Sequence, residues 1–174
     1  MPMMWQYTGR QRPSFAFEPG PGQESVWDYP RPPRTEADAR EVIVALGASE
    51  IVRTRRALRV LETASPPTFY VPRDDVKLEF IEPAAGHSSC EWKGTAVYWS
   101  VLVAGRRLPR VAWSYPDPAP RFAALRDCFG FYPAALDCFV DGERVQPQPG
   151  RFYAGWVPAE IVGPCKGEPG SEGW

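Results

Sequence analysis

TAVYWSVLV (95–103) and RVAWSY (110–115) are two runs of β-branched, aromatic and small residues, and Pro, Gly or charged residues bound each of them. This composition is typical of β-strands, because branched and aromatic side chains pack well on a pleated surface. TFYVP (68–72) and VKLEFI (76–81) have the same character. These four runs therefore predict at least four strands in the middle of the chain.

Two hairpins are predicted on either side of these runs. LDCFV (136–140) and ERVQP (143–147) flank Asp141-Gly142, a pair that suits a type I′ turn because both of its central positions need positive φ. Upstream, REVIVAL (40–46) and EIVRT (50–54) can pair across Gly47-Ala48. The mainly β reading thus extends over most of the chain.

Helix is expected to be scarce. The 21 Pro and 15 Gly among 174 residues interrupt helices. Pro120 to Asp127 predicts one short helix, with Pro in its first turn. RRALRVLET (55–63) fits either a helix with Leu58 and Leu61 on one side or a strand and turn.

The chain is expected to form a single compact domain of three parts: an N-terminal arm (1–35), a core (36–148) and a C-terminal arm (149–174). Both arms are irregular and rich in Pro and Gly. A solvated linker would not retain so many aromatic residues, so we predict that the arms pack on the core. These residues are Trp5, Tyr7, Phe15, Phe17, Trp27, Tyr29, Phe152, Tyr153, Trp156 and Trp174.

Composition excludes several classes of function. Twenty Lys plus Arg against 21 Asp plus Glu leave no basic excess for nucleic acid. No apolar stretch approaches the length that spans a bilayer, and the N-terminus lacks the pattern of a signal peptide. We expect a cytoplasmic protein with free thiols at its four dispersed cysteines.

Three stretches resemble a known family: RALRVLETASPPTFYVPRDDV, then CEWKGTAVYWSV, then VAWSYPDP with the following FYP. They are similar to the bacterial and fungal family called domain of unknown function 427, over about residues 40 to 147, and the arms look like those of its longer members. The resemblance implies a small, mainly antiparallel β domain related to the β-tent folds. A label used for the family points to nucleotidyl transfer.

The residues themselves do not favour nucleotidyl transfer. That reaction needs spaced carboxylates for a metal and usually a Gly-rich loop for the phosphates. Asp74-Asp75 is the only adjacent Asp pair, and it reads as a turn. No phosphate-loop motif is present.

Cys90 is a candidate for metal binding and for thiol catalysis. No CxxC pair exists, and His87 with Cys90 alone cannot complete a tetrahedral site, so we expect neither metal nor cofactor. Cys90 could be a nucleophile if His87 or Lys93 favours its thiolate. A solvated histidine in a polar loop, Gly86 to Ser89, is the commoner outcome.

The strongest candidate site consists of polar residues within aromatic strands. Charges in an apolar setting must pair or face a cavity. Arg59 and Glu62 could simply form a surface pair. The functional alternative is that Arg59, Glu62 and Lys93 converge on one cavity, with Glu62 between the two cations. Its proposed catalytic residues are Glu62, Lys93 and Cys90, and its ligand-binding residues are Arg59, Tyr70, Tyr98, Trp113 and Tyr115.

The first functional hypothesis is a domain that binds an anionic or planar polar small molecule. The second is a small hydrolase or transferase that uses Glu62 or Cys90. The third is a protein interaction module that uses the Pro-rich arms, which would require mobile arms with exposed aromatic side chains.

Overall fold

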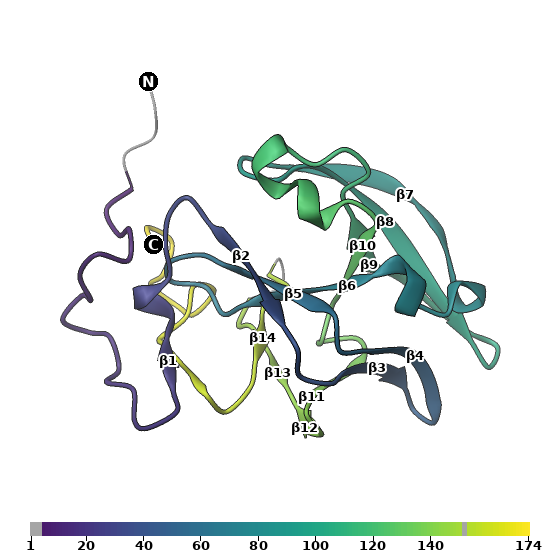
Figure 1. Cartoon of the computed structure of the whole chain (residues 1–174), viewed down its shortest axis with the longest axis horizontal. Helices are drawn as coiled ribbons and strands as arrows, with labels where there is room; N and C mark the ends of the chain where they lie inside the picture. The colour runs from purple at the N-terminus through teal and green to yellow at the C-terminus, as the bar shows by residue number, and fades with distance from the viewer. Residues whose placement is uncertain (1–4, 151–152) are drawn as a thin grey trace.

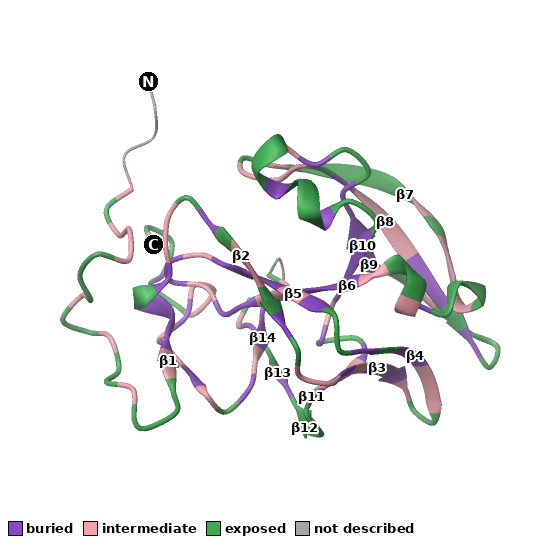
Figure 2. Ribbon diagram, in the orientation of Figure 1, coloured by how far each residue is buried: buried purple, intermediate pink, exposed green. Residues whose placement is uncertain are grey.

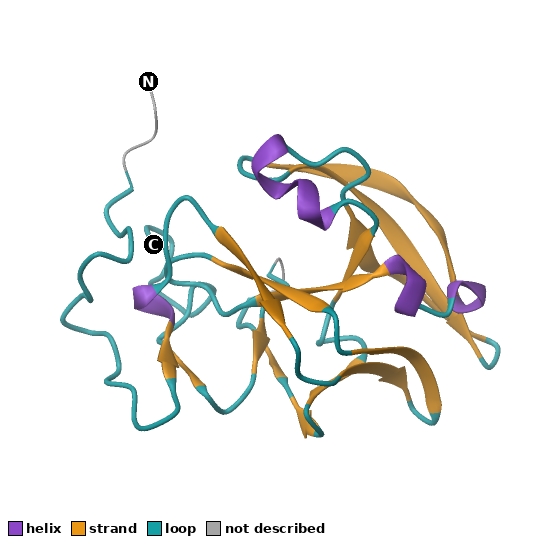
Figure 3. Ribbon diagram, in the orientation of Figure 1, coloured by secondary structure: helices purple, strands orange, loops and turns teal. Residues whose placement is uncertain are grey.

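The computed structural model describes residues 5–150 and 153–174, which form a mainly β structure. Within these ranges the largest sheet has seven strands, all paired antiparallel (Figures 1 and 3). In spatial order they are β2 (Arg34–Asp38), β5 (Ala57–Leu61), β6 (Thr68–Pro72), β10 (Cys128–Phe131), β9 (Arg106–Ser114), β8 (Gly94–Val103) and β7 (Ile81–Cys90).

A smaller antiparallel sheet contains both predicted hairpins. Its described strands, in spatial order, are β12 (Glu143–Arg144), β11 (Asp137–Val140), β3 (Val42–Leu46) and β4 (Ser49–Thr54). Asp141 has φ 47° and Gly142 φ 81°, as a type I′ turn requires. Gly47, with φ 59°, turns β3 into β4. Both hairpin predictions are confirmed.

Apolar side chains of both sheets form the main core. The ribbon in Figure 2 is purple where residues are buried. Phe69 and Phe129 come from the larger sheet, and Val44 and Ile51 from the smaller one. Trp156 of the C-terminal arm is fully buried among them, where its indole Nε1 donates to the Phe131 carbonyl at 3.0 Å. The C-terminal arm therefore contributes to the main core.

The helical segments of the described chain are short 3₁₀ turns: η1 (Val26–Asp28), η2 (Arg73–Asp75), η3 (Leu78–Phe80) and η4 (Pro120–Leu125). The helix predicted at Pro120 is present, although it ends at Leu125. The ambiguous stretch 55–63 contains strand β5, because β2 and β6 hydrogen-bond to its two edges.

Two local predictions were wrong between residues 76 and 90. VKLEFI is not a strand: the Lys77 amide bonds to Ile51, and the chain then turns through η3. The expected polar loop at 86–89 lies within β7, because its residues pair with β8 across a bulge between Ala84 and His87. Small polar residues occupy this strand because both of its faces are largely exposed.

The two arms pair with each other at one end of the molecule (Figure 1), where β1 (Glu24–Ser25) runs parallel to β15 (Ile161–Val162). The C-terminal arm also pairs with the end of the core, through β14 (Trp156–Val157) and β13 (Gln146–Pro147). The arms also share a buried cluster with two residues of the core, Leu61 and Ala64; its arm residues are Val26, Trp27, Tyr29, Ile161 and Cys165.

Three of the aromatic residues assigned to the arms, Trp27, Tyr29 and Trp156, are buried. Phe15 and Phe17 are exposed, and Phe152 lies outside the described residues. Strand β2 begins at Arg34, within the predicted N-terminal arm. Across the described ranges, no helix is long and apolar enough to cross a membrane.

Candidate functional site

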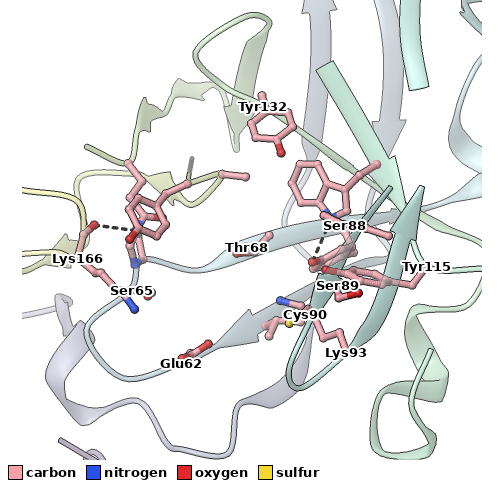
Figure 4. A pocket seen from close by; sticks show the side chains of 18 of the residues that line it. Glu62, Ser65, Thr68, Ser88, Ser89, Cys90, Lys93, Tyr115, Tyr132 and Lys166 are labelled. Carbon is pink, nitrogen blue, oxygen red and sulfur yellow. Dashed lines mark hydrogen bonds between the residues drawn. The ribbon is translucent and has the colours of Figure 1, made fainter. Parts of the chain in front are cut away.

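A cavity of about 390 Å³ opens between the larger sheet and the C-terminal arm (Figure 4). This cavity, called the tyrosine pocket below, fits the usual volume of a small-molecule site. Its lining includes seven of the eight predicted site residues: Glu62, Tyr70, Cys90, Lys93, Tyr98, Trp113 and Tyr115. Arg59 is not among them.

Strand register brings the aromatic side chains together. Tyr98 of β8 is directly opposite Trp113 of β9, and β10 follows β9 in the sheet. The indole of Trp113 lies over Gly130, its partner on β10, where any Cβ atom would overlap the ring. Glycine at position 130 thus makes room for the pocket wall.

The wall is neutral and rich in hydroxyl groups. Tyr70 is 1% exposed, and its hydroxyl oxygen accepts a hydrogen bond from the Trp113 indole at 3.4 Å. Burial raises the pKa of Tyr70 and Tyr115 well above that of a free phenol, and it raises the pKa of Tyr132 to about 12. Around neutral pH these phenols remain protonated.

Two lysines give the pocket positive charge. Figure 4 shows Lys166 on one side and Lys93 beside Cys90 and Tyr115 on the other. The Lys93 ammonium lies 5.9 Å from the centroid of the Tyr115 ring, and that of Lys166 lies 5.7 Å from the Trp5 ring. Within the described ranges, neither ammonium has a carboxylate within 4.0 Å.

Lys166 was missed by the sequence analysis. It belongs to the C-terminal arm, where its backbone N–H bonds to the Ala64 carbonyl and its own carbonyl accepts from the Gln148 side chain at 2.7 Å. No strand or helix pattern surrounds it in the sequence. Only its presence as the one lysine in an aromatic-rich arm could have drawn attention to it.

Glu62 lines the pocket, but its neighbours are not those predicted. Its carboxylate accepts from Arg31 Nε at 3.2 Å, so the expected position between Arg59 and Lys93 is wrong. The Arg31 side chain is 1% exposed, donates to the Tyr7 carbonyl at 3.0 Å and stacks over Trp5 at 4.1 Å. An arginine from the N-terminal arm therefore holds Glu62.

The predicted convergence of Arg59 with Lys93 is also wrong. Arg59 is buried on β5, and its guanidinium lies 2.9 Å from Glu24, 2.6 Å from Glu36 and 3.6 Å from Asp38. These carboxylates come from the N-terminal arm and from β2, on the other side of β5 from β6. Arg59 thus forms an ionic cluster away from the tyrosine pocket.

Cys90 is half-buried in the pocket, whereas His87 is exposed and does not line it. The two residues are three positions apart on β7, so their side chains leave opposite faces of the strand. Lys93, in the turn after β7, shares the cavity with the thiol. A His87–Cys90 dyad is therefore absent.

Asp75, Cys128 and Cys165 lie outside the tyrosine pocket. Asp75 accepts from the Thr54 hydroxyl at 2.6 Å and pairs with Arg56, as expected of a turn residue. Burial raises the pKa of Cys128 to about 11 and that of Cys165 to about 12. The described residues contain no group of three or more His, Cys, Asp or Glu that could hold a metal ion.

Residues 34–142 match the model of a family described as Domain of unknown function (DUF427). A search of the curated proteins found no match. The family match contains Glu62, Lys93 and the aromatic wall. It ends before Gln148 and before Tyr153, Ala154 and Lys166 of the C-terminal arm, which complete the pocket.

Proposed function

The chain belongs to the DUF427 family, and from this premise we propose that its tyrosine pocket binds a small, planar molecule with a negative charge. The observation that carries the proposal is the pair of lysines without carboxylate partners, Lys93 and Lys166, in one cavity of about 390 Å³.

Charge favours an anion. Glu62 is the one acidic residue among the lining residues described, and Arg31 already neutralises it. The phenols of the wall are uncharged, so the two ammonium groups leave the pocket positive. Ammonium groups in a partly buried site bind carboxylate or phosphate oxygens strongly, because less water competes there.

Shape favours a planar ligand. Tyr70, Trp113 and Tyr115 present ring faces and edges within one wall, with centroids 5.9 Å apart for Tyr70 and Trp113 and 6.3 Å apart for Tyr70 and Tyr115. Aromatic side chains bury flat apolar groups well, while their hydroxyl and indole groups fix orientation. An aromatic or conjugated acid combines both properties.

The test uses benzoate and phenyl phosphate as probes, with neutral benzamide as the matched compound without charge. Binding is followed by saturation-transfer NMR and by isothermal titration calorimetry. We expect both anions to bind more tightly than benzamide. In Lys93→Met, which keeps the length but removes the charge, affinity for the anions should fall about tenfold or more, because a charge-assisted hydrogen bond is lost.

Lys77→Met is the control, since Lys77 is an exposed lysine whose nearest acid is Glu50 at 3.8 Å, outside the pocket. Melting temperatures of both variants should stay near that of the parent protein. The proposal fails if none of the anions binds at millimolar concentration, or if Lys93→Met and Lys77→Met bind them equally well.

A catalytic version of this function is our second proposal, and the position of Cys90 in the pocket supports it. A thiolate there could attack a carbonyl group of the bound molecule, with Lys93 near the developing negative charge. We expect iodoacetamide to modify Cys90 and benzoate to slow that modification. If benzoate gives no protection, the thiol is not within the binding site.

A further inference from the structure

Arg110 has an unusual backbone conformation within β9. Its φ is 54°, a region in which non-glycine residues are uncommon and strained. The register of the β8–β9 pair shifts between Trp99 and Val101, and there the Arg110 amide donates to the Ser100 hydroxyl at 3.2 Å. At bulges with positive φ glycine is the usual residue, because it avoids the Cβ strain.

This conformation directs the Arg110 side chain across two neighbouring strands. The guanidinium lies 4.4 Å from the centroid of the Tyr98 ring on β8. It then reaches β7 at Gly86, where a Cβ atom would be 3.2 Å from Arg110 Nη2. Gly86 has φ 97° and lies in the bulge of β7 between Ala84 and His87. Irregularities in two strand pairs thus accommodate one arginine side chain.

Among the residues that the structure describes, the guanidinium of Arg110 has no anionic partner. In residues 5–150 and 153–174 no carboxylate lies within 4.0 Å of it, and no side-chain hydrogen bond is formed by it. It is exposed and stacks on Tyr98, which lines the tyrosine pocket. Tyr132, another lining residue, also feels its positive charge, which partly offsets the increase in pKa that burial causes.

We propose that Arg110 binds a second anionic group of the ligand at the rim of the tyrosine pocket. The inference rests on the proposed function and narrows it: the ligand would be a planar dianion, with one acidic group near Lys93 and another near Arg110. Guanidinium presents a planar fork of donors that matches carboxylate and phosphate oxygens bidentately. Stacking on Tyr98 orients this fork before the ligand arrives.

The test compares benzoate with two dianions, terephthalate and 4-carboxyphenyl phosphate, by calorimetry. The second dianion replaces one carboxylate by phosphate, so the pair distinguishes the two kinds of oxyanion. The parent protein should bind at least one dianion about tenfold more tightly than benzoate, as expected for an added bidentate contact. Arg110→Gly should lose that preference and keep the parent's affinity for benzoate.

The melting temperature distinguishes a role of Arg110 in ligand binding from a role in holding the fold. Glycine is at ease at φ 54°, so Arg110→Gly should melt at the same temperature as the parent or higher. Ala104→Gly is the matched control, because Ala104 is exposed in the turn of the same β8–β9 hairpin with φ 50°. It should change stability in the same direction and leave the preference for dianions intact.

The outcomes distinguish the two proposals. If benzoate binds and depends on Lys93, but no dianion is preferred, the role of Arg110 is overturned and the proposed function stands. A preference for dianions that survives in Arg110→Gly also overturns it. If none of the three probes binds, both proposals fall.

Discussion

Arg59 and Lys93 are the two cations that the sequence predicts at one site, yet they have opposite surroundings. Three carboxylates lie close to the Arg59 guanidinium, whose side chain is 6% exposed. Lys93 lines a cavity, and among the described residues no carboxylate lies close enough to pair with it. A cation with acids in reach contributes to the structure, whereas a cation without them is available to a ligand.

The acids around Arg59 come from parts of the chain that are distant in sequence. Glu24 belongs to the N-terminal arm, whereas Asp38 belongs to β2. Arg40 extends the cluster, since it pairs with Asp38 at 2.8 Å and with Glu160 of the C-terminal arm at 2.5 Å. The ionic cluster therefore ties both arms to the core, while the tyrosine pocket remains open.

Of the changes that test this comparison, deleting residues 1–33 should lower stability the most. It removes Glu24 together with the buried Val26, Trp27 and Tyr29 and leaves β2 intact. Each buried aromatic contributes about 1.5–3 kcal/mol, so we expect the melting temperature to fall by about 10 °C or more. Calorimetric unfolding measures this. An unchanged melting temperature would show that the arm does not support the ionic cluster.

Arg59→Met should cause the second largest loss of stability. Removing the cation leaves three carboxylates close together, and breaking a buried ion pair typically costs about 3–5 kcal/mol. Arg34→Met is the control, because the Arg34 side chain is 59% exposed and lies 3.4 Å from Glu36. An exposed ion pair contributes little, so this variant should lose under about 1 kcal/mol of stability. Denaturant unfolding compares the variants. Similar losses of stability in Arg59→Met and Arg34→Met would mean that burial does not make the ion pairs of Arg59 stronger than the exposed pair of Arg34.

Acid should weaken the ionic cluster. Burial opposes ionisation of Glu24 and Asp38, but hydrogen bonds from Arg59 to Glu24 and from Arg40 to Asp38 lower the pKa of both carboxyls below their ordinary values of 4.5 and 3.8. The stability that they contribute is therefore present above those values and lost as the pH falls through the lower folded pKa.

Denaturant unfolding at a series of pH values between neutral and strongly acidic measures this loss. In Arg59→Met, Glu24 loses the guanidinium that favours its ionised form, whereas Asp38 keeps Arg40, so the variant should lose less stability in acid than the parent. Equal losses would place the acid sensitivity outside the cluster.

Local pattern predicted β6, β8, β9 and both hairpins, and most of the pocket residues, but it did not predict β2, β7 or β10. Tyr98 and Trp113 are recognisable as strand residues, and pairing of their strands places them opposite each other. The partners of Arg59 and Glu62 were not predictable, because Glu24 and Arg31 are brought to them by an arm without periodic pattern. Arg110 was missed for another reason: its direction depends on bulges, which leave no periodic signal in the sequence.

The parallel pairing of β1 with β15 has a consequence for synthesis of the chain. Glu24 leaves the ribosome early, but its partner Ile161 follows only after all strands of the two larger sheets have been translated. Until then the first arm has neither its strand partner nor the apolar side chains of Ile161 and Cys165. A nascent chain halted before residue 161 should therefore be cut by protease within residues 5–33, whereas the released protein should resist at the same positions.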